Sequence, residues 1–268
     1  MSTTNAVAEL RGAIAPNRKL SPVSVRILFA AEGLLAFVVW WQSPFAVLPR
    51  PGEVFSALGE LWLTEGLGRE LIASITLNLE AMFWTTVISL GLSYLTVLPV
   101  FRPVALAASK GRFLGLIGLT LVFTLVTGGG HALKLSLLVF GMSVFFVTSM
   151  AAEVEQIPRD RFDHARTLRM SEWHVVWDVV ILGTADRALE LLRQNAAIGW
   201  MMLTMVEGIS RSDGGIGAML LNQNKHFRLA EVFAIQGVIL TVGLVQDFLI
   251  GALTRALLPY SNIGQERR

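Results

Sequence analysis

The chain contains no cysteine, which excludes disulfides, thiolate catalysis and cysteine metal sites. Histidine is scarce as well, and none of the four stands in an H-E-x-x-H motif that would bind zinc. The sequence also lacks a glycine-rich phosphate loop with Lys-Ser/Thr and a G-x-S-x-G nucleophile elbow. We therefore expect no catalytic residue, no metal and no cofactor, and no ATPase site in this chain.

Charged residues are few. They make up 16% of the 268 residues, whereas soluble domains usually carry about 25%. Hydrophobic residues make up 53%, and the mean hydropathy is +0.59. A membrane-spanning helix needs roughly 20 mainly apolar residues, so a chain of this length suits one membrane domain of about five to seven spans.

The apolar residues gather in segments that we interpret as transmembrane helices. The sequence predicts an all-α integral membrane protein with six spans, at residues 24–42, 80–99, 113–128, 133–151, 190–208 and 232–254. Residues 1–22 form a polar, basic tail, and residues 23–268 form a single transmembrane domain. The first apolar run ends in "VVWWQSPF", which lacks the small-residue pair of a signal-peptide cleavage site, so we expect an uncleaved span.

The distribution of lysine and arginine predicts the orientation. With the N-terminus inside, 16 of the 22 basic residues lie in cytoplasmic segments and 6 lie outside, as the positive-inside rule requires. Both termini are then cytoplasmic, and so is the charged loop at residues 155–185. Two outer stretches, "SPFAVLPRPGEVFSALGELW" and "GISRSDGGIGAMLLNQNKHFRLAEV", are each expected to hold a short helix at the interface.

The charged loop is amphipathic throughout. Asp160 is predicted to cap one short helix and Ser171 a second, with a bend near Met170, and both helices would lie along the membrane surface. A solvated loop is the simpler interpretation of its charge. However, its apolar face must bury against something, and it lacks the Gly/Ser/Pro content of a flexible linker. We therefore expect an exposed knob that a soluble partner contacts.

The loop "DHARTLRMSEWHVVWDVVIL" resembles the cytoplasmic loop of bacterial ABC-importer permeases, whose pattern is Glu-Ala-Ala, three residues, Gly, and later an aliphatic-Leu-Pro. The segments "VLPRPGEVFSAL", "RELIASITLNLEAMFWTTVISLGLSYL" and "EGISRSDGGIGAMLLNQNKHFRLAEVFAIQGVIL" are similar to those of the nitrate/sulfonate/taurine-type permeases. The resemblance extends over most of the chain.

In that family the loop forms the coupling helix, which docks into a cleft on the ATP-binding subunit. The family's Glu falls on Asp163, and its glycine falls on Arg169. Since the glycine serves the bend between two helices, Arg169 must adopt that geometry or the bend must move towards Ser171. The resemblance implies that the ATPase-coupling residues are Asp163, His164, Ala165, Arg166, Leu168, Arg169 and Trp173.

The resemblance further implies a type I ABC importer permease in the bacterial cytoplasmic (inner) membrane. Its partners would be cytoplasmic ABC ATPase subunits, an extracytoplasmic solute-binding protein and a second permease copy in a homodimer. The transported solute would be a small oxidised anion such as nitrate, a sulfonate or taurine.

Polar residues within spans mark transport paths more often than chance. Asn78, Asn195 and Thr204 are candidates to line a path, and hydrogen bonding between helices is the alternative. Two other function classes stay open. An ion-gradient-driven secondary transporter would favour paired acids deep in the spans, where only Glu32 fits, and an integral-membrane enzyme would need convergent acid, base or metal-binding residues.

Overall fold

The computed structural model describes residues 21–43, 45, 47–210 and 214–258, and within these ranges every regular element is helical. Contacts between residues divide the chain into two units, 1–56 and 57–268. Each unit is described by itself.

The first unit contains helix α2, Pro22–Trp41. Ser21 is its N-cap and accepts a hydrogen bond from the backbone N–H of Ser24 at 3.2 Å, and Pro22 occupies the first helical position, where its missing N–H costs nothing. The side chains described on α2 from Val23 to Trp41 are almost all exposed, although the helix is strongly apolar. Such a helix needs an apolar environment.

Helix α3, Pro51–Leu63, begins in the first unit and continues into the second. It begins at Pro51, and proline is well suited to the first helical position. Glu53 lies in the first turn, and its Oε2 accepts a hydrogen bond from the Arg50 N–H at 3.0 Å.

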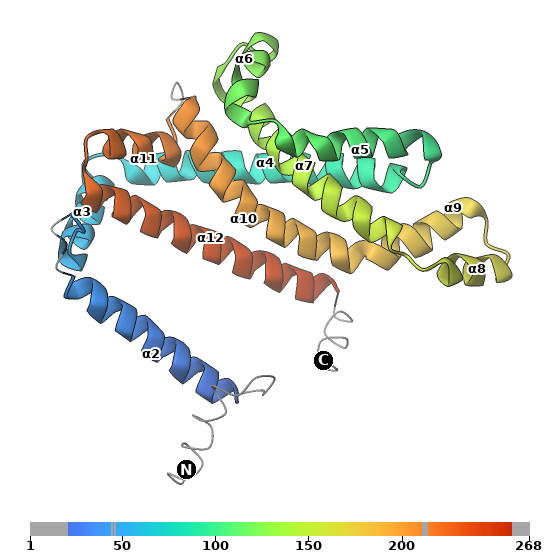
Figure 1. Ribbon diagram of the computed structural model, residues 1–268, viewed down its shortest axis with the longest axis horizontal. Coiled ribbons are helices and arrows are strands. Elements are labelled where there is room, and N and C mark those ends of the chain that lie inside the picture. The colour runs from blue at the N-terminus through green and yellow to red at the C-terminus, as the bar shows by residue number, and fades with distance from the viewer. Residues whose placement is uncertain (1–20, 44, 46, 211–213, 259–268) are drawn as a thin grey trace, which may run out of the picture. The chain divides into compact units, whose positions relative to one another are not determined.

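Long helices build the second unit (Figure 1). These are α4 (Leu67–Leu95), α7 (Gly130–Glu155), α10 (Ala185–Ile209) and α12 (Leu229–Leu257). Shorter helices connect them: α5 (Arg102–Lys110), α6 (Leu116–Thr127), α8 (Arg159–Thr167), α9 (Glu172–Val175) and α11 (Ile216–Lys225). Two 3₁₀ turns, Pro99–Phe101 and Gly111–Phe113, flank α5.

The buried core lies where α4, α7 and α10 meet. One cluster comprises Leu77, Ala81, Leu138, Met142, Trp200 and Leu203, and a second comprises Leu116, Leu133, Leu137 and Val206. Helices α7 and α10 contribute to both clusters, and α7 also contacts α4, α5 and α6, which makes α7 the central helix of the unit.

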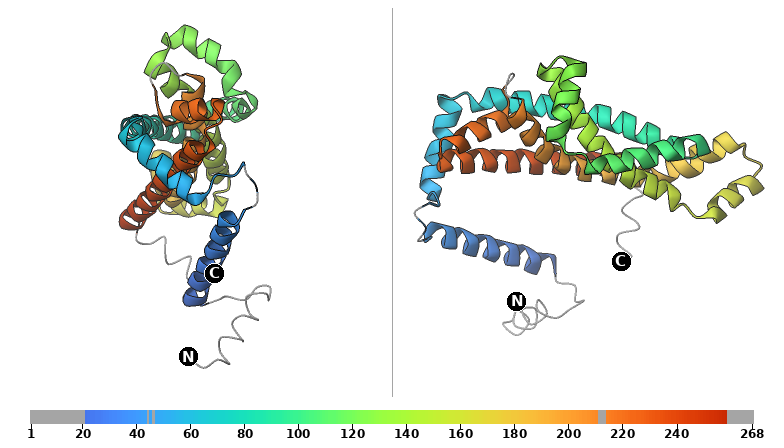
Figure 2. Two further views of the ribbon diagram at one scale, coloured as in Figure 1. Left: turned by 90° about the vertical axis from the view of Figure 1, so that its left-hand side faces the viewer. Right: turned by 45° about the horizontal axis from the view of Figure 1, so that its top comes forward.

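Helix α6 departs from the long helices. It has 12 residues, about 18 Å at 1.5 Å per residue, and the segment Pro99–Phe113 meets it at an angle of 117°. Figure 1 and Figure 2 show α6 standing away from the other helices of its unit. A glycine turn follows, and Gly128 and Gly129 take φ of 78° and 99°, a region in which side-chain-bearing residues are strained.

The connection from α9 to α10 is an unbroken but irregular helix. A π-helix covers Val176–Ile181, and a 3₁₀ turn covers Leu182–Thr184. The Leu182 N–H therefore donates to the carbonyl of Trp177, five residues earlier. The sequence predicted two short helices along a surface. The structure instead has one separate short helix, α8, and a second that continues into α10.

In the part of the chain that the structure describes, four helices are long and apolar enough to cross a membrane, or five if the bent pair counts as one span. They are Val23–Trp41, Leu67–Leu95, Gly130–Glu155 and Leu229–Leu257, and each overlaps a predicted span. By length and composition the chain is thus a multi-pass membrane protein. Six spans, cytoplasmic termini and a single domain from residue 23 stay predictions.

Two predicted spans differ from the helices at their positions. The segment 113–128 holds only the 12 residues of α6, too few to cross a hydrocarbon core of about 30 Å unaided. The segment 190–208 lies within α10, which has the length of a span but carries Asp186, Arg187, Glu190 and Arg193. Because of those charges, α10 is not among the helices that are apolar enough to cross a membrane.

Large apolar side chains are exposed along α4, α6 and α12. Leu121, Leu125 and Val126 of α6 are examples, as are Phe248 and Leu249 of α12. Soluble monomers rarely expose contiguous apolar surface on this scale. A lipid bilayer or a protein partner would cover this apolar surface.

Candidate functional site

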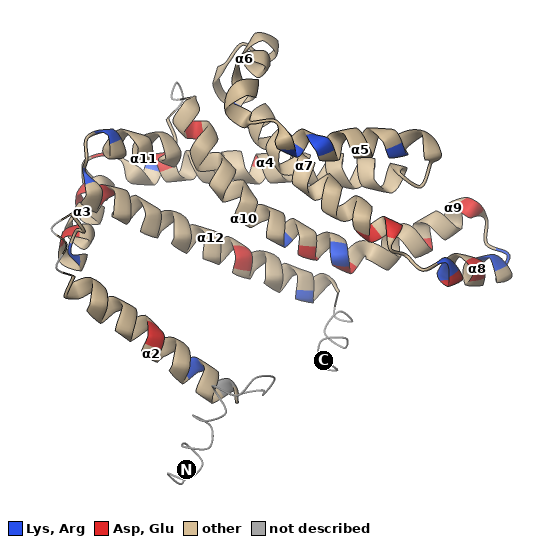
Figure 3. Cartoon of the chain, viewed as in Figure 1, with Lys and Arg blue, Asp and Glu red and all other residues tan. Residues whose placement is uncertain are grey.

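The predicted coupling residues gather on the α8–α9 hairpin, residues 158–175, at one end of the second unit (Figure 1). Asp163, His164, Ala165 and Arg166 lie on α8, and Leu168 is its C-cap. Arg169 lies in the turn, and Trp173 lies on α9. Figure 3 shows charged residues along α8 and at the start of α9, whereas α6 carries none.

One predicted cap is wrong. The N-cap of α8 is Pro158, at φ −61° and ψ 139°, and Asp160 lies inside the first turn. Proline fixes φ near this value, and its extended ψ places the N-cap two residues before the acid, so the helix begins at Arg159. Asp160 still complements the positive end of the helix dipole. Ser171 is confirmed as the cap of α9, where its Oγ accepts from the His174 N–H at 3.4 Å.

Arg169 adopts the glycine geometry. Its φ is 58°, in the left-handed region. The Met170 N–H donates to the Ala165 carbonyl at 3.4 Å, and the Arg169 N–H donates to the Arg166 carbonyl at 2.9 Å. These two bonds are the Schellman pattern that usually ends on glycine. The bend therefore stays at the position of the family's glycine, with arginine in its place.

Arg166 ties the two arms of the hairpin together. Its Nε and Nη2 donate to the two carboxylate oxygens of Glu172 at 3.0 and 3.2 Å, and its Nη1 lies 3.5 Å from Asp163. The hydrogen bond and the positive charge of Arg166 hold the pKa of the Glu172 carboxyl below its usual range. The same hydrogen bond and the negative charge of Glu172 raise the pKa of Arg166. The pair is solvent-exposed, so it orders the turn more than it stabilises the protein.

The hairpin presents apolar side chains to solvent. Leu168 is 64% exposed and Trp173 is 71% exposed, whereas Ala165 is buried. A hollow of 610 Å³ lies beside them, and its lining includes Asp160, Arg161, His164, Leu168, Met170 and Asp178. Exposed apolar side chains, a tryptophan among them, are typical of a protein-binding surface.

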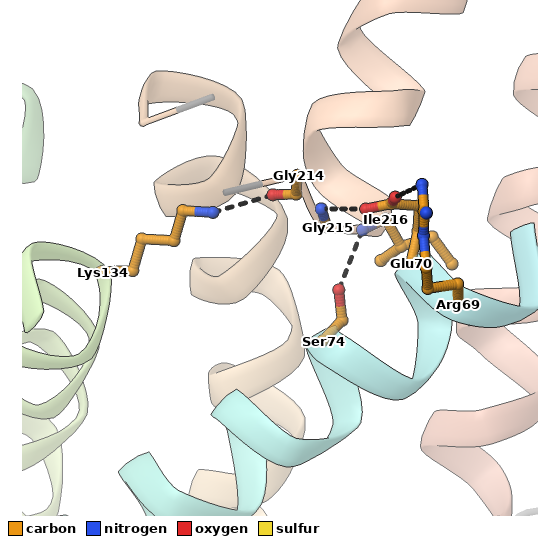
Figure 4. Close-up of polar contacts among 7 residues, drawn as sticks. All are labelled: Arg69, Glu70, Ser74, Lys134, Gly214, Gly215 and Ile216. Carbon is orange, nitrogen blue, oxygen red and sulfur yellow. Dashed lines mark hydrogen bonds and ion pairs between the residues drawn. The ribbon is translucent and has the colours of Figure 1, made fainter. Parts of the chain in front are cut away.

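A second constellation lies at the N-terminus of α11, and Figure 4 shows most of it. We call it the clasp, and it consists of Glu70, Ser74, Lys134 and Glu207. Glu70 Oε2 accepts from the Gly215 N–H at 2.6 Å, and Ser74 Oγ accepts from the Ile216 N–H at 2.8 Å. Lys134 Nζ donates to the Gly214 carbonyl at 2.8 Å.

Glu207 completes the clasp from α10. Its Oε1 accepts from the Ser74 hydroxyl at 2.6 Å, and its Oε2 accepts from the Gly217 N–H at 2.8 Å. Glu207 is 1% exposed and Lys134 is 3% exposed. The clasp thus satisfies backbone donors at the start of α11 with side chains from α4 and α10, and it joins four helices.

Sequence reasoning did not find the clasp. The position of Glu207 near the end of a predicted span does not specify its interaction partners. A lysine at the start of an apolar segment was the available signal, since a buried charge requires partners. The clasp joins residues up to 145 positions apart in the chain, so their pairing needs the tertiary structure.

The path candidates do not form one group. Asn78 and Asn195 are buried at 0% and 2% exposure. Asn78 Oδ1 accepts from Gln246 Nε2 at 3.1 Å, and Trp200 Nε1 donates to Gln246 Oε1 at 2.6 Å. Thr204 instead lines a separate groove of 430 Å³ between α10, α11 and α12.

A further ion pair joins α10 to α12. Arg193 Nε and Nη2 donate to the two oxygens of Asp247, each at 2.7 Å. Gly251 lies against the guanidinium, because a Cβ at that glycine would be 3.6 Å from Arg193 Cζ. Sequence reasoning did not assign this pair.

The arrangement of long, apolar helices with an exposed charged hairpin defines the class of fold as a multi-pass helical membrane protein. No protein-family model matches the chain, and no curated protein sequence matches it either. Among solved structures, the fold is similar to a chain of the MetNI methionine ABC transporter, determined in inward-facing conformations. The similarity has a TM-score of 0.58 at 18% identity and covers 74% of this chain and 97% of that chain.

Proposed function

We propose that the chain is the membrane-spanning permease subunit of an ATP-driven ABC importer. The observation that carries this proposal is the similarity of fold to a chain of an ABC transporter, which covers nearly all of that chain. The loop and outer segments that resemble importer permeases support it independently, because they are properties of the sequence alone.

In this proposal the α8–α9 hairpin contacts a separate cytoplasmic ATPase. Leu168 and Trp173 supply an exposed apolar contact, and Asp163 and Arg166 flank it with charge. The Arg166–Glu172 pair and the Arg169 turn hold the two arms at a fixed angle, so that movement of the ATPase is transmitted to α10 through the continuous helix. ATP hydrolysis itself belongs to the partner.

The finer features of the proposal come from the sequence resemblance and the charge distribution. They are six spans within residues 23–268, cytoplasmic termini, a homodimer, an extracytoplasmic solute-binding protein and a place in the bacterial inner membrane. The solute would be a small oxidised anion such as nitrate, a sulfonate or taurine. The similar solved structure is that of a methionine transporter, so an uptake assay should include methionine as well as these anions.

The decisive experiment is co-purification of the detergent-solubilised chain with its cognate ATPase subunit. Asp163→Lys and Leu168→Glu should each abolish co-purification, because the first inverts a charge and the second buries one in an apolar contact. Leu63→Glu is the matched control, since Leu63 is also a highly exposed leucine but lies on α3. Unchanged co-purification in both hairpin variants contradicts the assignment.

The side of the membrane can be tested directly, because the native chain has no cysteine. A single Leu168→Cys variant should react with a membrane-impermeant maleimide in inverted vesicles and stay unlabelled in right-side-out cells. Labelling from the outside would place the hairpin out of reach of a cytoplasmic ATPase and would overturn the proposal.

A further inference from the structure

A line of polar side chains runs along one face of α4. Ser74, Asn78, Thr85, Ser89 and Ser93 are each fully buried, and they follow one another at intervals of four or seven residues. Side chains at these intervals lie on the same face of a helix. The line therefore faces the interior of the second unit rather than lipid.

Most of this line has no hydrogen-bond partner among the described residues. The unpartnered buried atoms on α4 are Asn78 Nδ2, Thr85 Oγ1, Ser89 Oγ and Ser93 Oγ. The others are Ser143 Oγ on α7 and both amide atoms of Asn195 on α10. These seven atoms all belong to the three helices that share the core.

Helices α4 and α10 run antiparallel, which places Asn195 in the line. Gly199 lies beside Asn78, because a Cβ at Gly199 would be 3.3 Å from Asn78 Nδ2. Near the other end, the Thr184 and Tyr94 hydroxyls are 3.5 Å apart. Asn195 precedes Gly199 by one turn, so it lies about one turn beyond Asn78, in the interval before Thr85.

Dry burial of these groups is unfavourable. A buried polar group without a partner loses its hydration and gains nothing in return, and almost all such groups in folded proteins are paired with protein or ordered water. The hydroxyls could turn towards carbonyls of their own helix, as Thr86 does towards Met82 at 2.7 Å. That solution is not open to Asn195, whose amide has both donors and an acceptor to satisfy.

We infer that the six residues Asn78, Thr85, Ser89, Ser93, Ser143 and Asn195, here called the polar column, bind a file of ordered water molecules between α4, α7 and α10. Hydroxyls and amides both donate and accept, which suits water, and a buried water typically makes about three hydrogen bonds. The column contains no charged side chain, so its chemistry favours water over an ion. This site is independent of the proposed transport function.

The column extends over much of the helix. From Asn78 to Ser93 it spans 15 residues, or about 22 Å. The clasp lies beyond one end, and the Tyr94–Thr184 contact lies at the other. Hydrogen bonds to water exchange partners easily, so α4 can shift against α10 without leaving polar groups unpaired.

Radiolytic hydroxyl-radical labelling tests the column directly, because radicals formed from bound water oxidise adjacent side chains. Met142 is the reporter, since it is fully buried and its Sδ would lie 3.2 Å from a Cβ at Gly199. The exposed Met201 is the positive control within the same sample. We expect Met142 to be oxidised in the native protein, and oxidation to fall several-fold in Asn195→Leu. Oxidation of Met201 with none of Met142 overturns the inference.

A pair of neighbouring threonines gives a second test that does not depend on the Asn195 variant folding. Thr85 belongs to the column, whereas the Thr86 hydroxyl bonds to its own helix. Bound water predicts that Thr85→Val lowers the Tm more than Thr86→Val, because the new methyl displaces water that other column residues need. In a column without water, Thr85→Val only removes an unpaired hydroxyl. If Thr85→Val lowers the Tm by no more than Thr86→Val does, the inference is refuted.

Discussion

The clasp and the α8–α9 hairpin are the two most polar constellations described in this protein, and they are built in opposite ways. In the clasp, buried or partly buried side chains from α4, α7 and α10 hold the start of α11 through contacts between distant parts of the chain. In the hairpin, exposed side chains bond only to residues within six positions of their own.

The difference indicates different tasks. Buried hydrogen bonds that join several helices fix one arrangement, since breaking any of them leaves another group unpaired. Exposed local bonds keep the shape of a segment but leave its surface free for a partner. We therefore expect substitutions in the clasp to unfold or loosen the protein, and substitutions in the hairpin to change association at nearly constant stability.

Glu207→Leu should have the largest effect on stability. It leaves the Ser74 hydroxyl and the Gly217 N–H unpaired in the core, and each such group costs about 1–3 kcal/mol. We expect a loss of about 4 kcal/mol, seen as a large fall in Tm. Glu207→Gln keeps an acceptor and a similar shape, so it should lose much less, and equal losses would show that the clasp bonds carry little energy.

Gly217→Ala should come next. A Cβ at this position would overlap the backbone of Thr204 on α10, and backbone cannot move aside. Overpacking of this kind costs about 1–3 kcal/mol, and thermal unfolding of the purified protein measures it. Gly237→Ala on α12 is the matched control, because nothing lies within 4 Å of its Cβ. A similar Tm for both variants would contradict the close approach of α11 to α10.

Arg169→Gly should give a small gain. A side-chain-bearing residue at φ 58° is strained, and glycine relieves about 1 kcal/mol of that strain. Leu168→Gly is the contrasting variant, since Leu168 at φ −79° has no strain to relieve and should lose stability. Chemical denaturation of the two variants compares them, and a loss for Arg169→Gly would be inconsistent with the left-handed turn.

The pH dependence of the hairpin should be the smallest effect. The pKa of Glu172 is lowered by Arg166 in the folded protein. The order that the pair confers is therefore complete above the pKa of an unfolded glutamate and is lost as the pH falls through the lowered value. Spin labels at Arg159→Cys and Trp173→Cys should report a broader distance distribution at low pH.

Glu172→Gln provides the control for that measurement, because glutamine does not titrate. Its distance distribution should be broad at every pH. If acid broadens the distance distribution of this variant as much as that of the native protein, a group other than Glu172 causes the pH dependence.

The helices were predictable where one property dominates their residues. Residues 133–151 and 232–254 are mainly apolar, with one charged residue each, and the helices there, Gly130–Glu155 and Leu229–Leu257, overlap them closely. Helix α4 begins 13 residues before its predicted start at residue 80, because Arg69 and Glu70 make its first turns look like a loop. Those turns bear the clasp, so the polar residues that obscure the helix in the sequence are the ones that fix it in the fold.

The candidate site was predictable in position but not in detail. The density of charge located the hairpin, and Ser171 was identified as a cap from its residue type and place alone. The N-cap of α8 at Pro158 and the φ of Arg169 depend on backbone geometry that residue type does not specify. The Arg193–Asp247 pair and the clasp depend on the packing of distant helices, which a single sequence does not reveal.

The π-helix at Val176–Ile181 sets the direction in which the hairpin faces. A π turn accommodates one residue more than an α turn, and each α-helical residue turns the chain by about 100°. Deleting one residue there, such as Val179, would turn the segment into regular helix and rotate everything before it about the axis of α10. Trp173 and Leu168 would then face a different side of the molecule with their local structure intact. The direction in which this surface faces is therefore encoded separately from its local structure.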